Sequence, residues 1–212
     1  MIKTENYNGK IEISKSETLR YLGNAPLADL QGGDEVIKIA ENAIAEVKDC
    51  ALCRACFEYF PIAAESDTCA DLGFAKTNSK NLIKNLSGCG GIILFVATVG
   101  IEIDRLIKKY EKTSLMRAAA VGASGSAAVE AWCDILCRKF SERARKAERS
   151  TRPRFSPGYG DLPLAMQKEI FRALSPEKRI GVTLSESLMM MPSKSVSAIV
   201  GVTGNGAELD FL

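Results

Sequence analysis

The sequence of 212 residues contains no histidine. Catalysis by a Ser-His-Asp triad or a Cys-His pair is therefore excluded, and so are zinc sites that use imidazole ligands. An excess of charge of one sign is missing as well, because 28 lysines and arginines stand against 26 aspartates and glutamates, a formal net charge of +2. This balance gives no electrostatic case for a nucleic-acid partner.

Long hydrophobic runs are also absent. The longest apolar stretch, residues 92–99, falls far short of the roughly 20 residues that span a bilayer. The N-terminus, residues 1–6, lacks the apolar region of a signal peptide. We therefore expect a cytoplasmic protein without a membrane partner, whose seven cysteines are reduced.

The hydrophobic pattern predicts helices and strands that alternate without a strict repeat. Helical patterns cover residues 34–59, 101–112, 127–149 and 164–174, and strand-like apolar runs cover 92–96, 180–184 and 196–202. Residues 118–128 are mostly Ala, Gly and Ser, which allow close backbone approach. We expect one α+β domain over residues 1–212, with a mostly antiparallel twisted sheet flanked by helices and a less regular segment at 1–33.

Three cysteines have a spacing that iron–sulfur proteins use. Cys50, Cys53 and Cys56 form C-x2-C-x2-C, so an iron–sulfur electron carrier is one hypothesis. The fourth ligand at the bacterial-ferredoxin position is missing, and the segment continues a helical pattern. These two observations favour the alternative, in which the thiols pack as small hydrophobic side chains.

The segment 152–161, with the sequence RPRFSPGYGD, has the composition of a preshaped binding loop. Its prolines flank Phe155 and Ser156 and reduce their freedom before any ligand arrives. Arg154 offers a planar set of donors that suits a carboxylate, and Gly158 leaves the backbone open. Tyr159 adds a flat face and a hydroxyl. The segment suits a zwitterionic ligand with an aromatic ring; the alternative is a proline-rich connection with an incidental arginine and tyrosine.

Two further features each allow a functional and a purely structural interpretation. The consecutive residues Met189–Met191 cannot all face one core, and methionine suits broad, flat partners; the alternative is an apolar turn beneath a helix. Glu130 lies on the long predicted helix with Asp134 one turn later. The default interpretation of such a pair is a solvated helix face.

These stretches together resemble the activation domain of cobalamin-dependent methionine synthase. The resemblance extends over about residues 90–203. It rests on the following segments: Arg154–Gly160 (RFSPGYG), Leu184–Ser187 (Leu-x-Glu-Ser) with Pro192 after it, Ser195–Ser197, and Ala128–Ala131 within the helix. The short chain is similar to the free-standing version of that domain, so we expect a subunit of a split enzyme.

The resemblance implies a concrete activity. The family binds S-adenosylmethionine and meets a module that carries cobalamin oxidised to the inactive Co(II) state. A flavodoxin- or ferredoxin-like donor supplies one electron, the sulfonium methyl passes to cobalt, and methylcobalamin is restored. The chain would be the reactivation subunit of a methyltransferase system in methionine biosynthesis, without a catalytic side chain of its own. The alternative is a non-catalytic docking or redox-gating subunit for another corrinoid methyl-transfer protein.

The resemblance also assigns roles by position. Arg154 would pair with the carboxylate of the ligand, and the backbones of Ser156 and Gly158 would line it. Tyr159 would lie against the ligand near the corrin. Glu130 would place negative charge near the cationic ligand. We further expect a loop that faces the corrin-carrying partner, formed by Met190, Met191, Ser193 and Lys194.

Overall fold

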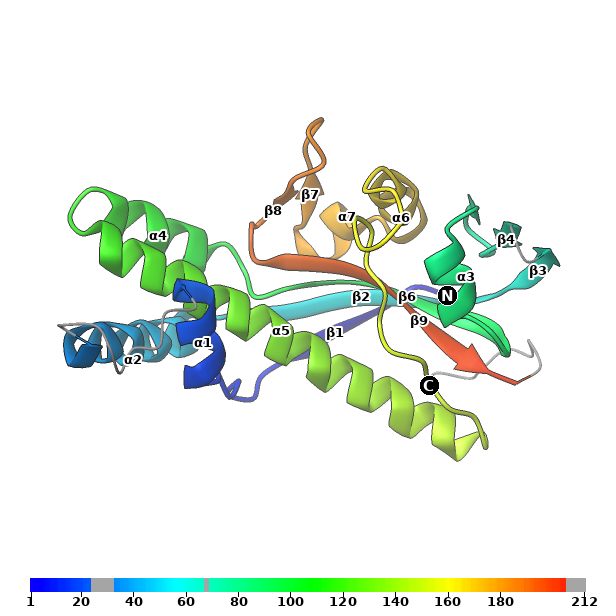
Figure 1. The fold of residues 1–212 in the computed structure, drawn as a ribbon, viewed down its shortest axis with the longest axis horizontal. Helices are drawn as coiled ribbons and strands as arrows, with labels where there is room; N and C mark the ends of the chain where they lie inside the picture. Colours follow the sequence, from blue (N-terminus) through cyan, green and yellow to red (C-terminus); the bar gives the residue numbers. More distant parts are fainter. Residues whose placement is uncertain (24–32, 67–68, 205–212) are drawn as a thin grey trace.

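The central element of the computed structural model, which describes residues 1–23, 33–66 and 69–204, is an antiparallel sheet with the strand order β1-β2-β6-β9 (Figure 1). Its strands are β1 (Lys3–Tyr7), β2 (Cys53–Pro61), β6 (Cys89–Thr98) and β9 (Ser195–Thr203). Residues 92–97 of β6 are at most 1% exposed, because this inner strand is covered on both faces. The expected α+β fold, an antiparallel sheet flanked by helices, is confirmed.

One face of the sheet is covered by the long helix α5 (Leu115–Lys146), which crosses it obliquely (Figure 1). The helices α1 (Lys15–Leu22), α2 (Gly33–Cys50) and α4 (Glu102–Glu111) pack against α5. Trp132 of α5 is fully buried in this layer, and its ring stacks on Tyr7 with a centroid distance of 5.4 Å.

The opposite face is covered by the short helices α3 (Lys80–Asn85), α6 (Met166–Leu174) and α7 (Pro176–Ile180). The strands β3 (Ala63–Ser66), β4 (Cys69–Asp71) and β5 (Lys76–Thr77) form a small sheet at one end of the molecule. The strands β7 (Thr183–Leu184) and β8 (Met190–Met191) form a hairpin that projects beside α7 (Figure 1).

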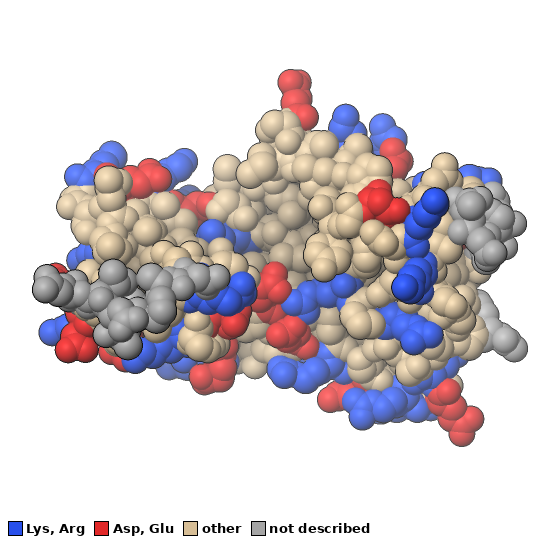
Figure 2. Space-filling view, viewed as in Figure 1, with Lys and Arg blue, Asp and Glu red and all other residues tan. Residues whose placement is uncertain are grey.

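Lysines and arginines gather over the C-terminal end of α5 (Figure 2). The last turn of this helix contains Arg143, Arg145 and Lys146. Cations at this position are stabilised by the partial negative charge of the helix C-terminus. Among the described residues, no helix combines the length and the apolar composition that a bilayer crossing requires.

The sequence prediction was wrong for the second half of residues 34–59. Helix α2 ends at Cys50, and β2 begins at Cys53. The segment contains Phe57, Tyr59 and Phe60, and it pairs with β1 on one side and β6 on the other. Pairing as an inner strand, together with aromatic side chains that suit strands, outweighs the helical periodicity.

Two other boundaries also differ from the prediction. Helix α5 begins at Leu115 rather than near Ala127, because alanine has the highest helix propensity and the small side chains pack closely against α2 and α4. Residues 180–184 are not a continuous strand. Pro176 begins α7, and Gly181, with φ +74°, ends it. The N-terminal segment contributes β1 and α1, while its residues 24–32 lie outside the described residues.

Candidate functional site

The segment that follows α5 returns along the outer edge of β9. The backbone of Phe155 exchanges two hydrogen bonds with Ile199, of 2.8 and 2.9 Å, and the Arg152 amide donates to the Gly201 carbonyl at 2.8 Å. Phe155 is 8% exposed and packs in the layer of α6 and α7. The next residue back, Arg154, reaches α5 on the other face of the sheet. The edge pairing therefore fixes the backbone on which Arg154 is carried.

Arg154 is held between two carboxylates of α5. Its Nη2 donates to Oε2 of Glu130 and its Nη1 to Oδ1 of Asp134, both at 2.5 Å. Figure 2 shows acidic and basic side chains next to one another over the middle of α5. Burial works against the positive charge, but the hydrogen bond with Asp134 and the charge of Glu130 raise the pKa of Arg154 above its ordinary value. The guanidinium is therefore a permanent cation, three-quarters buried, at the face of α5.

The expected solvated face for Glu130 and Asp134 is only partly what the structure shows. The two side chains are 43% and 59% exposed, so solvent reaches them, but both pair with Arg154. Their i, i+4 spacing puts both carboxylates on one face of the helix. Cys137 lies one turn further along the helix, and burial raises the pKa of its thiol.

The turn after Phe155 presents Tyr159 to solvent. Tyr159 is 70% exposed, and its ring meets Phe155 edge to face with a centroid distance of 5.5 Å. The turn is closed by backbone hydrogen bonds from Tyr159 to Ser156 and from Gly158 to Leu162. Gly158 has φ +88°, a conformation that favours glycine. The predicted binding residues on this segment therefore share one ordered turn next to Arg154.

Asp161 anchors this turn to α3, a contact that the sequence analysis missed. Its carboxylate accepts hydrogen bonds from the hydroxyl of Ser79 and from the backbone amides of Lys80, at 2.8 Å, and Asn81, at 3.2 Å. The bond from Ser79 lowers the pKa of Asp161. About 80 residues separate Asp161 from its partners in the sequence, so no local sequence pattern predicts the contact.

Replacing Asp161 by asparagine is expected to reduce stability in a pH-dependent way. The depressed pKa means that the carboxylate contributes stability above the pKa of an unfolded aspartate, about 3.9. That contribution is lost as the pH falls through the lower folded value. Thermal melts from pH 7 to pH 2.5 should show a difference between wild type and Asp161→Asn that disappears in acid. Glu186→Gln, at an exposed position of the hairpin, is the control, and a difference independent of pH would contradict the assignment.

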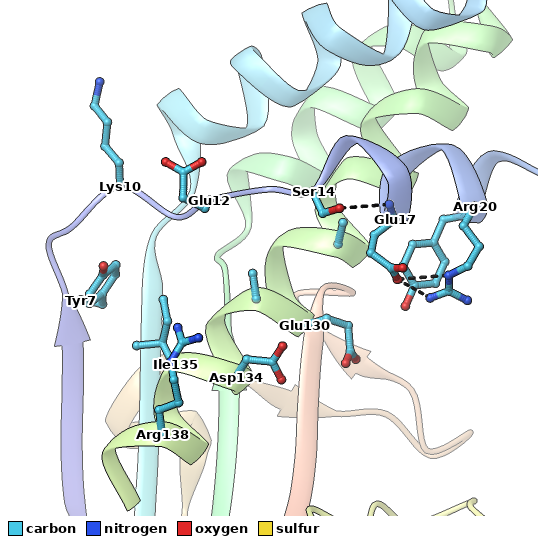
Figure 3. Close-up of a pocket in the computed structure, with 13 residues that line it drawn as sticks. Tyr7, Lys10, Glu12, Ser14, Glu17, Arg20, Glu130, Asp134, Ile135 and Arg138 are labelled. Carbon is cyan, nitrogen blue, oxygen red and sulfur yellow. Dashed lines mark hydrogen bonds and ion pairs between the residues drawn. The ribbon is translucent and has the colours of Figure 1, made fainter. Parts of the chain in front are cut away.

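A groove of about 580 Å³ lies between the N-terminal segment and α5 (Figure 3). Tyr7 and Tyr21 contribute aromatic surface, and Glu130 and Asp134 contribute carboxylates. Arg154 and Tyr159 are not among its lining residues. The two carboxylates thus border the groove and also bind Arg154. A ligand in contact with Glu130 can therefore reach both the groove and Arg154.

The residues predicted to face a partner lie around β8 and the start of β9. Met191 is 49% exposed, while Met190 is half-buried and packs against the core. The backbone amide of Ser193 donates to Asp104 at 3.1 Å. Lys194 turns toward α5, where its Nζ donates to the hydroxyl of Ser126 at 3.1 Å, and burial lowers its pKa. Contact of this loop with a corrin-carrying partner stays a prediction.

The iron–sulfur hypothesis is contradicted by the placement of the cysteines. Cys53 and Cys56 lie on β2 and pack in the two different core layers, on opposite faces of the sheet. Burial raises the pKa of each thiol to about 12. Within residues 1–23, 33–66 and 69–204, no three potential metal ligands are grouped together. Cys53 and Cys56 act as buried hydrophobic side chains.

Comparison with known proteins gives a family and a fold. The family described as vitamin B12 dependent methionine synthase, activation domain, matches residues 81–207. The match includes every residue predicted to bind a ligand. The structure is similar to the crystal structure of the MetH reactivation domain bound to AdoHcy, with a TM-score of 0.65 and 19% sequence identity, covering 95% of this chain and 78% of that chain. No curated protein sequence matches the chain.

Proposed function

The chain belongs to the family of vitamin B12-dependent methionine synthase activation domains, and from this premise we propose that it binds S-adenosylmethionine and supports reductive methylation of cobalamin on a partner module. The observation that carries the proposal is Arg154, held against α5 beside an exposed tyrosine. The fold is that of a reactivation domain whose crystal structure contains AdoHcy.

The charges around Arg154 suit a ligand that is both anionic and cationic. Glu130 and Asp134 carry −2 and Arg154 carries +1, so the cluster has a net charge of −1. A guanidinium has more N–H donors than the two that bind these carboxylates, so the carboxylate of an amino acid can still bind it. The remaining negative charge attracts a sulfonium. We assign Arg154 to the carboxylate of the ligand and Glu130 to its positive centre.

The turn supplies the rest of the proposed site. Its exposed Tyr159 ring offers a flat surface to the ligand and to the corrin, and the backbones of Ser156 and Gly158 line the ligand. A Cβ at Gly158 would lie 3.3 Å from Leu164, a side chain that is itself 41% exposed. Tyr159 and Leu164 thus form an accessible apolar surface next to the turn, which is compatible with a corrin.

This chain binds and orients a methyl donor, and it needs no general base. Cobalamin on the partner supplies the nucleophile once an electron donor of the flavodoxin or ferredoxin type has reduced its cobalt. The absence of histidine is compatible with this role, since the chain contributes position and charge. We propose that the chain acts in the cytoplasm as the reactivation subunit of a split methionine synthase.

Calorimetry with S-adenosylmethionine and S-adenosylhomocysteine tests the binding step. The two ligands share a carboxylate, but only the first carries a sulfonium charge. We expect Glu130→Gln to reduce the ratio of their affinities by about fivefold, corresponding to about 1 kcal/mol for a partly exposed charge pair. Glu142→Gln, on an exposed position of the same helix, should leave the ratio unchanged. Absence of heat with either ligand, with and without a cobalamin-loaded module, would contradict the proposal.

Transfer of a labelled methyl group from S-adenosylmethionine to a reduced cobalamin module tests the second step. Methylation that depends on this chain would support the proposal. Binding of the module without transfer would instead favour a docking or redox-gating subunit.

A further inference from the structure

A second pocket lies at the β1 edge of the sheet, opposite the β9 edge that carries the Arg154 segment. It has a volume of about 420 Å³ and opens where β1 ends and β2 begins. It is lined by Asn6, Tyr7, Asn8, Leu52, Cys53, Arg54 and Arg179. None of the roles proposed above uses it.

The lining residues include two arginines and no carboxylate. In the part of the chain that the structure describes, neither Arg54 nor Arg179 has an ion-pair partner. By contrast, Arg105, Arg117 and Arg172 each pair with a glutamate within 3 Å. The pocket therefore has a local charge of +2 that no side chain among the described residues neutralises, and like charges at one site repel each other.

The fold brings the two arginines together from distant parts of the chain. Arg54 is the register partner of Asn6 in the β1–β2 pair, so these two side chains lie side by side on one face of the sheet. Arg179 comes from the last turn of α7, which packs against β2 on the same face. Burial raises the pKa of the thiol of Cys56 on that face, and the positive charge of Arg179 offsets part of this effect.

We infer that this pocket binds the oxyanion group, phosphate or carboxylate, of a small molecule. Planar guanidinium groups bind both oxyanions through paired hydrogen bonds, and the side-chain amides of Asn6 and Asn8 add neutral donors. An anion bound here offsets part or all of the charge of the two arginines. Tyr7 lines both this pocket and the groove beside Glu130, but the inference does not depend on the proposed S-adenosylmethionine site.

A spectroscopic reporter lies next to the pocket. Trp132 is the single tryptophan of the sequence. Its Nε1 donates to the backbone carbonyl of Arg54 at 3.1 Å, and its ring stacks on Tyr7, which lines the pocket. Occupation of the pocket is therefore expected to change the intrinsic fluorescence of the protein.

Titrations of the full chain with inorganic phosphate, glycerol phosphate and succinate, at constant ionic strength, test the inference. We expect saturable fluorescence changes, with affinity lowered at least about tenfold by Arg54→Gln and by Arg179→Gln. Arg172→Gln, which removes an exposed arginine of α6, should leave affinity unchanged. Binding of the two phosphates alone identifies a phosphate site, and binding of succinate alone identifies a carboxylate site.

Phosphorus-31 line broadening and calorimetry repeat the measurement without the tryptophan, and thermal melts confirm that each variant folds. Absence of saturable binding of all three anions would overturn the inference. The inference would also be overturned if both arginine variants bound the anions with the same affinity as the wild type.

Discussion

Replacing Arg154 by alanine is expected to weaken S-adenosylmethionine binding by about thirtyfold or more. Loss of a hydrogen bond between charged groups costs about 2 kcal/mol of binding free energy, which corresponds to a rise in Kd of about thirtyfold. The substitution also leaves Glu130 and Asp134, now held by Arg154 at 2.5 Å, without a cation. Their uncompensated charge then repels the carboxylate of the ligand. Calorimetry at fixed ionic strength measures the change.

Arg172→Ala is the matched control for this substitution. Arg172 also pairs with a carboxylate, Oε1 of Glu169 at 2.7 Å, but it lies on α6 and its side chain is 73% exposed. Its removal should not change the affinity. Arg154→Lys, which keeps the charge and loses the planar set of donors, should fall between wild type and Arg154→Ala. Unchanged affinity in a folded Arg154→Ala protein would remove Arg154 from the site.

Much of the sheet could be predicted because its inner strand has a simple pattern. Residues 92–96 are continuously apolar, and the structure buries them on both faces in β6. The strand β2 could not be predicted in the same way. Its identity depends on pairing with β1 and β6, and the sequence of residues 53–61 also fits the end of a helix. Long-range pairing decided between two locally acceptable structures.

The candidate site could likewise be predicted in part from local sequence patterns. Prolines and glycines marked the segment 152–161 as an ordered turn, and the structure places Arg154 and Tyr159 on it. The i, i+4 spacing of Glu130 and Asp134 could have indicated a pair of carboxylates facing one partner. The anchor at Asp161 had no such signal, because α3 and the turn are distant in the chain and meet only after folding.

Helix α5 connects the two sites, because it carries Glu130 at one and Trp132 beside the other. Trp132 is fully buried, stacks on Tyr7 and donates to the Arg54 carbonyl. It therefore fixes both the helix and the β1 edge of the sheet.

Replacing Trp132 by alanine is expected to lower the free energy of unfolding by about 3–5 kcal/mol, since it opens a large cavity and removes the donor. Urea unfolding followed by circular dichroism measures this loss. Trp132→Phe retains most of the packing and removes the N–H, so it should cost about 1–2 kcal/mol, for one lost hydrogen bond and a smaller ring. A loss below about 1 kcal/mol in Trp132→Ala would show that α5 is held to the sheet mainly by other contacts. Oxyanion binding that is weakened in Trp132→Phe under conditions in which the variant is fully folded would show that the tryptophan positions Arg54 in addition to packing the core.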